Sequence, residues 1–231
     1  MNPSLNSTRT KLEYMKYLVT YTMSQLADED TLSVVTFSEN ALVRGHSGES
    51  RPYYWKPANS SNVQLLIDEV NALQSSGRSN WMEGFDVTFN LIDESLRRIV
   101  ANNEDECKVE NVALMFFSDG DMNFPAGITG AEVTKYVETR IKMSEAISTT
   151  GDFHIHPFLY TLGNASPKQV AKDISCASNG IWRGLTEEVS AQNVTYGLET
   201  LFSTPMGHNA HMNFTTWSEP YTFTSSGETG V

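Results

Sequence analysis

The stretch NVALMFFSDG, residues 111–120, decides the fold of this chain. From Asn111 to Phe117 the run is almost entirely apolar, which is typical of a β-strand that is covered on both faces. It stops at Ser118-Asp119-Gly120, a turn sequence with a hydroxyl and a carboxylate. We therefore predict a buried strand that ends in a polar loop.

Outward from this strand, the hydrophobic period alternates between that of helices and that of strands. Predicted helices cover residues 11–27, 63–73, 82–99, 131–148, 167–177 and 187–202, and predicted strands cover 31–37, 41–44, 153–162 and 180–185. The segment Thr31–Phe37 is expected to be buried, with Ala41–Arg44 as its hairpin partner. This alternation predicts an α/β fold with a doubly wound, mainly parallel sheet and helices on both faces.

Length and charge limit the classes of partner. The chain has 231 residues, enough for one large domain or one domain with a short appendage. Its 16 Lys and Arg against 28 Asp and Glu give a net charge of −12, which argues against nucleic acid or an anionic membrane surface as partner. No apolar run approaches the roughly 20 residues of a membrane-spanning helix, and residues 1–9 contain no signal-peptide core.

Three polar loops occupy the places where a parallel sheet holds its ligands, beyond the carboxyl ends of strands. They are Asn2–Ser7, Gly77–Asn80 and Ser118–Gly120. Hydroxyl, amide and carboxylate oxygens are hard donors, so they suit Mg²⁺, Ca²⁺ or Mn²⁺ better than zinc.

On these loops the chain resembles the von Willebrand factor type A (VWA) family, over roughly residues 2–203. Ser33–Ser38 is similar to the family's second strand, Gly77-Arg78-Ser79-Asn80 to its G-x-T-N loop, and Ser118-Asp119-Gly120 to its T/S-D-G loop. The resemblance implies a Rossmann-like fold with a metal-ion-dependent adhesion site (MIDAS). The implied ligands of Mg²⁺ or Ca²⁺ are Asn2, Ser4, Asn6, Ser79 and Asp119.

Two departures from the family pattern weaken that site. Asn2 and Asn6 stand where the D-x-S-x-S loop has its leading aspartate and its last serine, which removes one negative charge. The family's first, central strand normally precedes this loop, and only Met1 precedes it here, so we expect that strand to be missing from the chain or supplied by another segment.

Further features resemble the branch of calcium-channel alpha-2/delta subunits and related VWA-Cache proteins. They are Cys107, the segment Cys176–Trp182 and the exit segment Trp217–Tyr221. This implies a VWA-like domain over 1–203 and a linker or the start of a Cache-like domain over 204–231, within a larger extracellular or cell-surface glycoprotein. A membrane would be reached only through the parent protein or a partner.

Two modifications fit an oxidising compartment. Cys107 and Cys176 flank elements expected to be neighbours in the sheet, so we predict a disulfide between them. Five N-x-S/T patterns occur, at Asn6, Asn59, Asn164, Asn193 and Asn213, of which Asn164 and Asn193 are the favoured glycan carriers. Asn6 cannot easily serve both a glycan and a metal.

Several residues allow a structural interpretation. Asp119 can be a simple Asp-Gly turn, and Ser79 can cap the long helix. His154 and His156 alternate along a strand and are favoured as structural residues over zinc ligands. The group Tyr53-Tyr54-Trp55, with Arg51 and Lys56, is either a contact patch or a loop folded onto the domain.

No enzymatic motif is present: the sequence lacks a G-x-S-x-G elbow, a Walker loop, H-E-x-x-H and G-x-G-x-x-G. The favoured hypothesis is a non-enzymatic extracellular protein-binding or assembly module, in which a bridging cation takes an acidic side chain from a protein partner. The alternative is a structural component of a glycoprotein assembly with a vestigial metal site.

Overall fold

The computed structural model describes residues 10–46, 54–101, 111–120, 122, 126–148, 153–163 and 168–185. In chain order its elements are α1 (Lys11–Met23), β1 (Thr31–Leu32), β2 (Val35–Phe37), β3 (Ala41–Val43), β4 (Lys56–Pro57), α2 (Ser60–Asn71), α3 (Trp81–Ala101), β5 (Asn111–Ser118), α4 (Gly130–Glu145), β6 (His154–Leu162), α5 (Gln169–Ala177) and β7 (Ile181–Leu185). The predicted helix over 187–202 and the predicted segment 204–231 lie outside these residues. No helix among the described residues is long and apolar enough to cross a membrane.

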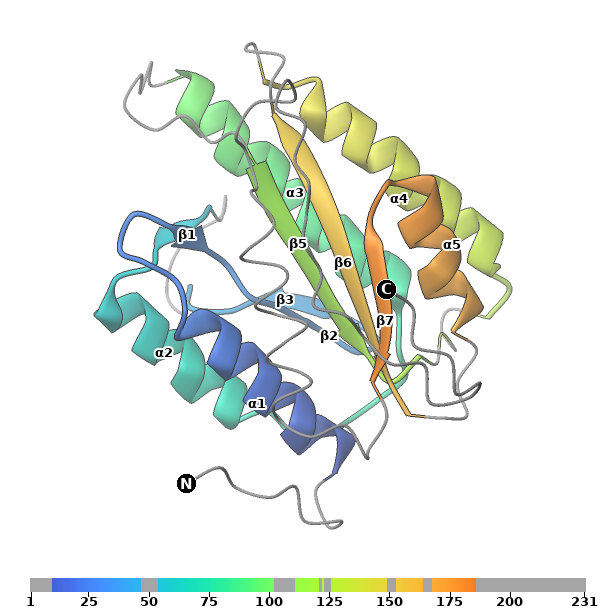
Figure 1. Cartoon of the computed structure of the whole chain (residues 1–231), viewed down its shortest axis with the longest axis horizontal. Coiled ribbons are helices and arrows are strands. Elements are labelled where there is room, and N and C mark those ends of the chain that lie inside the picture. The colour runs from blue at the N-terminus through green and yellow to red at the C-terminus, as the bar shows by residue number, and fades with distance from the viewer. Residues whose placement is uncertain are drawn as a thin grey trace, which may run out of the picture.

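A parallel sheet of β5, β6 and β7, in that order, forms the centre of the structure (Figure 1). Leu114 lies opposite Pro157, and Phe158 lies opposite Ile181. The strands alternate with α4 and α5 along the chain, so each connection crosses from one end of the sheet to the other. The predicted α/β fold with helices on both faces is confirmed.

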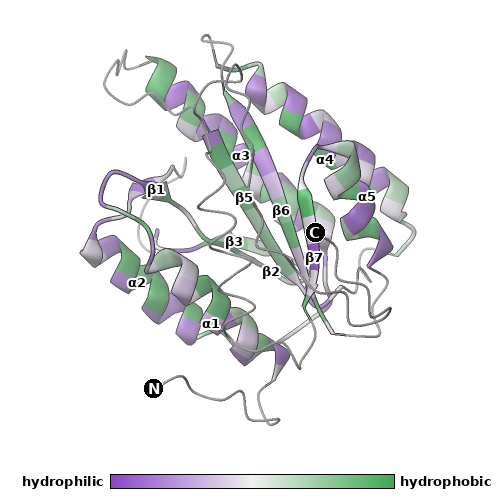
Figure 2. Ribbon diagram, viewed as in Figure 1, coloured by the Kyte–Doolittle hydropathy of each residue, from purple (hydrophilic) through white to green (hydrophobic). Residues whose placement is uncertain are grey.

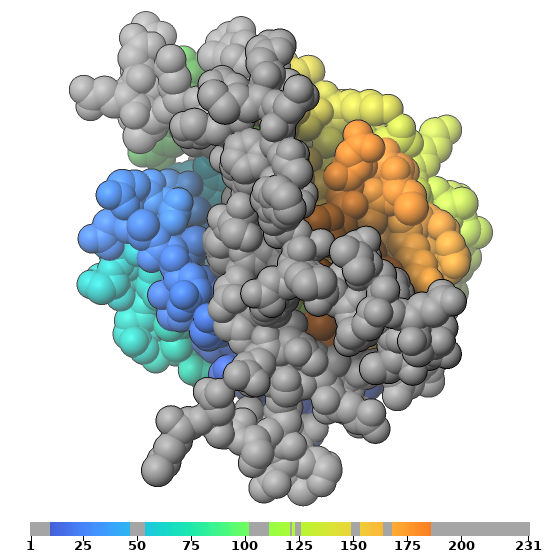
Figure 3. Space-filling view, viewed as in Figure 1, coloured from blue at the N-terminus to red at the C-terminus, as the bar shows by residue number. Residues whose placement is uncertain are grey.

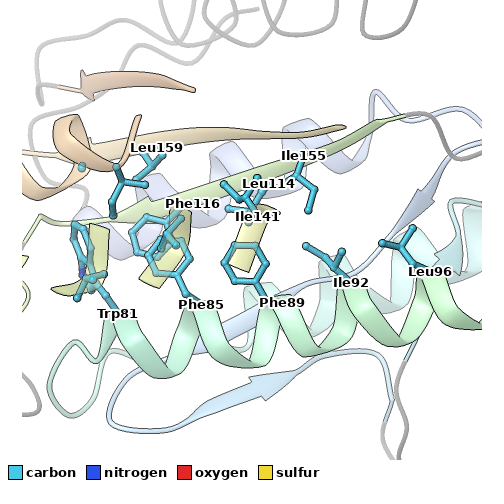
Figure 4. Close-up of a cluster of buried hydrophobic side chains, with 14 of the residues drawn as sticks. Trp81, Phe85, Phe89, Ile92, Leu96, Leu114, Phe116, Ile141, Ile155 and Leu159 are labelled. Atoms are coloured by element: carbon cyan, nitrogen blue, oxygen red, sulfur yellow. The ribbon is translucent and has the colours of Figure 1, made fainter. Parts of the chain in front are cut away.

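The face of the sheet beneath α3, α4 and α5 carries the larger core, which we call the first core. Phe85, Phe89 and Ile92 of α3 point toward Leu114 and Phe116 of β5 (Figure 4). The four-residue and three-residue steps along α3 place these side chains on one stripe. Each large side chain that is fully buried contributes about 1.5–3 kcal/mol, so this face holds much of the apolar stabilisation.

Among the described residues, the opposite face is covered by α1, and this cover is less complete. Tyr14 and Leu18 of α1 pack with Phe158 and Tyr160 in the second core. Apolar strand residues lie along the sheet (Figure 2), yet on this face of β5 Met115 and Phe117 are half-buried and Ala113 is exposed.

Within the described residues, the cover of β5 on this face is therefore incomplete. One cause lies in α1, because some of its side chains face α2 instead of the sheet. Met23 packs with Leu66 and Val70 of α2 and with Leu32 in a third core.

The segment 31–37 is two short strands, and β2 is half-buried, so the single buried strand expected there is wrong. Thr31 pairs antiparallel with Pro57, while Val35 pairs antiparallel with Val43. The chain changes partner between these pairings, which interrupts the ladder. The predicted hairpin partner over 41–44 is confirmed as β3.

Side chains join the hairpin to the parallel sheet. Among the described strands, β2 pairs only with β3, and β5 pairs only with β6. The rings of Phe37 on β2 and Phe116 on β5 stack with centroids 5.3 Å apart. Within the described residues, this aromatic contact holds the ends of β2 and β5 together.

Candidate functional site

An aromatic cluster centred on Phe116 lies directly beneath the predicted site. Its ring contacts those of Phe37, Trp81 and Phe85, with centroid distances of 5.3, 4.9 and 4.6 Å. Gly84 permits this approach, because a Cβ atom there would lie 3.0 Å from Cγ of Phe37. The cluster therefore brings the ends of β2 and β5 to the start of α3.

Asn80 fixes the loop that precedes α3. Its backbone N–H donates to the carbonyl of Ser38 (2.9 Å), and its side-chain amide donates to the carbonyl of Glu39 (3.1 Å). Its Oδ1 accepts from the N–H of Glu83 (3.2 Å), which satisfies one of the free donors of the helix start. The side-chain cap considered for Ser79 is thus found one residue further on.

The loop after β5 is stabilised by a hydrogen bond between two of its own residues. The buried Ser118 accepts a hydrogen bond at Oγ from the N–H of Gly120 (3.1 Å). Gly120 has φ +93°, a conformation that favours glycine. Asp119 lies between them and is half-buried. The structure confirms the Asp-Gly turn, and this turn also places a carboxylate at the carboxyl end of the sheet.

Two of the five predicted metal ligands flank this aromatic cluster along the chain. Ser79 lies beside the start of α3 and Asp119 at the end of β5, and Trp81 and Phe116 join these two places. Both residues are half-buried. The other three predicted ligands, Asn2, Ser4 and Asn6, lie outside the described residues.

The chemistry of the described donors suits a hard cation but does not complete a site. Ca²⁺ takes six to eight oxygen ligands and Mg²⁺ takes six, whereas Ser79 and Asp119 offer a hydroxyl and a carboxylate. Within the described residues, no group of three or more His, Cys, Asp and Glu side chains could hold a metal ion. Ser79 and Asp119 could therefore supply only some of the oxygen ligands of a cation. The other ligands would have to come from other residues, such as the predicted loop over residues 2–6.

Glu39 was not predicted as a residue of this region. It is exposed on the turn after β2, and its Cγ lies 3.5 Å from the position that a Cβ on Gly77 would occupy. Its carboxylate adds negative charge beside the loop that carries Ser79. The available signal was its place in Ser38-Glu39-Asn40, a polar turn directly after a strand.

The predicted modification sites are described only in part. Cys176 is exposed on α5 and has no disulfide partner among the described residues, but Cys107 lies outside them, so the pairing stays a prediction. Asn59 is exposed and caps α2, its Oδ1 accepting from the N–H of Asn62 (3.0 Å). The favoured glycan sites Asn164 and Asn193, and also Asn213, lie outside the described residues.

His154 and His156 occupy structural positions at the amino end of the sheet. A ring nitrogen of His156, Nε2, lies 3.0 Å from Oδ1 of Asn111, which joins β6 to β5. Nδ1 of the exposed His154 lies 3.7 Å from the carboxylate of Glu145. Burial lowers the pKa of His156, and the neighbouring His154 lowers it further.

The aromatic group over 53–55 is folded onto the domain where it is described. The guanidinium of Arg98 lies 4.0 Å from the centroid of the Tyr54 ring, and the N–H of Trp55 donates to Oγ of Ser95 (3.1 Å). The contacts of Tyr54 and Trp55 favour the loop interpretation over the contact patch. Tyr53 and Arg51 lie outside the described residues.

Comparison with solved structures identifies the fold. A von Willebrand factor type A protein from Catenulispora acidiphila superimposes with a TM-score of 0.61 at 14% identity. The fold is similar to that of a von Willebrand factor type A domain. The match covers 84% of this chain and 38% of that protein, so this chain spans well under half of its length. No protein-family model matches the chain, and no curated protein matches it.

Proposed function

We propose that this chain is a non-enzymatic protein-binding module that recognises an acidic side chain of its partner through a divalent cation at the carboxyl end of the sheet. The observation that supports the proposal is the contact between the rings of Trp81 and Phe116, which joins the start of α3, just after Ser79, to β5, which ends just before Asp119. Ligands of open α/β sheets bind at this end.

In this proposal, Asp119 holds the cation by charge and Ser79 by its hydroxyl. Asn2, Ser4 and Asn6 would add oxygen donors, and the cation supplies the positive charge that a partner's carboxylate needs. Asn80 positions the loop through its hydrogen bonds to Ser38 and Glu39. With Asp119 as the only carboxylate among the five ligands, the site should bind weakly until the partner completes it.

Calorimetric titration with Mg²⁺, Ca²⁺ and Mn²⁺ tests this site. Asp119→Ala should abolish binding, whereas Asn2→Asp should tighten it roughly tenfold, which corresponds to about 1.4 kcal/mol. Asp68→Ala removes an exposed carboxylate on α2 and should leave binding unchanged. An affinity that survives Asp119→Ala would move the cation to another part of the chain.

The amides at residues 2 and 6 favour a second candidate function, a structural component of a glycoprotein assembly with a vestigial metal site. This candidate replaces the first if neither the parent chain nor Asn2→Asp binds a cation. Both candidates belong to the proposed extracellular, VWA-Cache setting. Two free thiols after non-reducing denaturation, or an unchanged mass after glycosidase treatment of the native protein, would contradict that setting.

A further inference from the structure

The outer edge of β7 is a second surface with distinct chemistry. Among the described strands, β7 pairs only with β6, so it forms the edge of the parallel sheet opposite β5. Part of the orange segment that contains α5 and β7 is visible in Figure 3. Ile181, at the start of the strand, is 43% exposed. An exposed strand edge presents backbone groups that can pair with another strand.

Lysines of α5 and its cap approach β7 from the face that α5 covers. Nζ of Lys172 lies 4.5 Å from the centroid of the Trp182 ring. Nζ of Lys168 lies 3.2 Å from the position that a Cβ on Gly184 would occupy. Both ammonium groups therefore lie close to the strand.

Two more cations lie at the carboxyl half of β7. Arg183 is exposed, and because side chains alternate along a strand, it points to the face opposite Trp182. Nζ of Lys11 lies 3.2 Å from the Cβ position of Gly163, whose N–H donates to the carbonyl of Leu185 (2.9 Å). Positive charge thus flanks the end of β7 on both faces.

These cations lack carboxylate partners within the described residues. No ion pair there involves Lys11, Lys168, Lys172 or Arg183. The carboxylates on the same two helices bind locally: Glu13 accepts from Thr10, and Asp173 accepts from Gln169. Within the described residues, four cations without an ion-pair partner thus lie on or near β7, although the whole chain carries a net charge of −12.

We propose that the β7 edge binds an acidic, extended peptide segment of a partner protein, which adds to the sheet as a further strand. Backbone hydrogen bonds to β7 supply affinity, as in other cases of strand addition. Acidic side chains on the α5 face meet Lys168 and Lys172, and apolar side chains on the other face contact Ile181. A second copy of this chain does not fit, because pairing two β7 edges would bring like charges together.

This surface is independent of the cation site, and its test separates the two. The probe is a fluorescein-labelled peptide, Glu-Val-Glu-Val-Glu-Val-Glu, titrated with the full chain by fluorescence anisotropy in buffer with EDTA. Binding should persist in EDTA and in Asp119→Ala. It should weaken at least tenfold in Lys168→Glu/Lys172→Glu.

The matched control is Lys135→Glu/Lys142→Glu, which makes the same charge change on two exposed lysines of α4. It should change the affinity less than twofold, and circular dichroism should show that both double variants are folded. Equal losses in the two variants would overturn the proposal, because net charge alone would then explain binding.

A peptide N-methylated at every peptide bond keeps the charges but has no backbone N–H to donate to the strand ladder, so it should bind at least tenfold more weakly. Equal binding of this peptide would overturn strand addition. The proposal also fails if the peptide does not bind while phosphatidylserine vesicles or oligothymidine bind in a manner that depends on Lys168 and Lys172.

Discussion

The two faces of the parallel sheet differ in how completely they are covered, and consecutive residues of β5 show the difference. Phe116 is 6% exposed and contacts three other aromatic rings in the first core. Phe117 points to the opposite face, where it is half-buried and stacks on Tyr160 with a centroid distance of 5.0 Å. The α3–α5 face is thus packed like a protein core, whereas the α1 face retains accessible apolar surface among the described residues.

Buried polar groups occur on both faces. Between α3 and α4, the buried Asp93 accepts hydrogen bonds from Arg140 and Ser144, so its charge is paired. On the α1 face, the hydroxyl of Tyr14 is buried and has no hydrogen-bond partner among the described residues. Burial raises the pKa of Tyr14 to about 12. The α3–α5 face also holds buried polar atoms without a partner among the described residues, Nε1 of Trp81 and Oγ of Ser175, so the two faces differ in packing and not in hydrogen bonding.

Alanine substitution of the two phenylalanines tests this comparison most directly. Phe116→Ala should reduce the free energy of unfolding by about 4 kcal/mol, since it removes a fully buried ring and leaves a cavity. Phe117→Ala should cost about 2 kcal/mol, because part of that ring is already in contact with water. Urea unfolding measures both. Equal losses would mean that the α1 face is as completely packed as the other.

Both faces have one helix that begins with a capping box, which allows a smaller matched test. Thr10 accepts from the N–H of Glu13 in α1, and Thr129 accepts from the N–H of Glu132 in α4. Thr129→Ala should cost about 1 kcal/mol, typical of a lost cap.

Thr10→Ala removes the same hydrogen bonds, so it should also cost about 1 kcal/mol if α1 is docked as firmly as α4. A smaller loss would show that α1 frays from the less complete face without unfolding the domain. Urea unfolding gives the global loss, and amide exchange of the first turn of each helix separates fraying from global unfolding.

The long periodic elements were predictable from sequence because their patterns were unambiguous. The expected helix over 82–99 is α3 at 81–101, and the strand over 153–162 is β6 at 154–162. The expectations that failed depend on tertiary context. The run 31–37 has high β-propensity throughout, yet its two halves pair with different partners, Pro57 for Thr31 and Val43 for Val35. Propensity carries no information about the partner.

The candidate site was partly predictable for a similar reason. Ser79 and Asp119 follow from the order of polar loops after strands. Asn80 joins its loop to Ser38 and Glu39, and this role could not be predicted. It depends on side-chain and backbone hydrogen bonds between residues about 40 positions apart. The aromatic contact between Trp81 and Phe116 is also long-range, and periodicity does not specify which rings meet.

The smallest expected effect is a pH dependence that arises on the less complete face. His156 shares its side of β6 with Phe158 and Tyr160 of the second core, because alternate residues point the same way. The pKa of His156 is lowered, first by burial and then by His154, while Glu145 acts in the opposite direction. A lowered pKa means that the unfolded chain binds the proton more readily than the folded one. The resulting stability is complete above the unfolded value near 6.5 and is lost as pH falls below it toward the folded pKa.

Urea unfolding at pH 5, 6, 7 and 8 should therefore show a smaller decline toward pH 5 in His156→Gln than in the parent protein. His154→Gln is the control, and it should keep most of the decline because burial is the larger cause of the shift. If the parent and His156→Gln decline equally, the ring of His156 has enough contact with water to accept its proton freely. The α1 face would then be more open at the amino end of β6 than the half-burial of Phe117 indicates, and the contrast between the two faces would be larger.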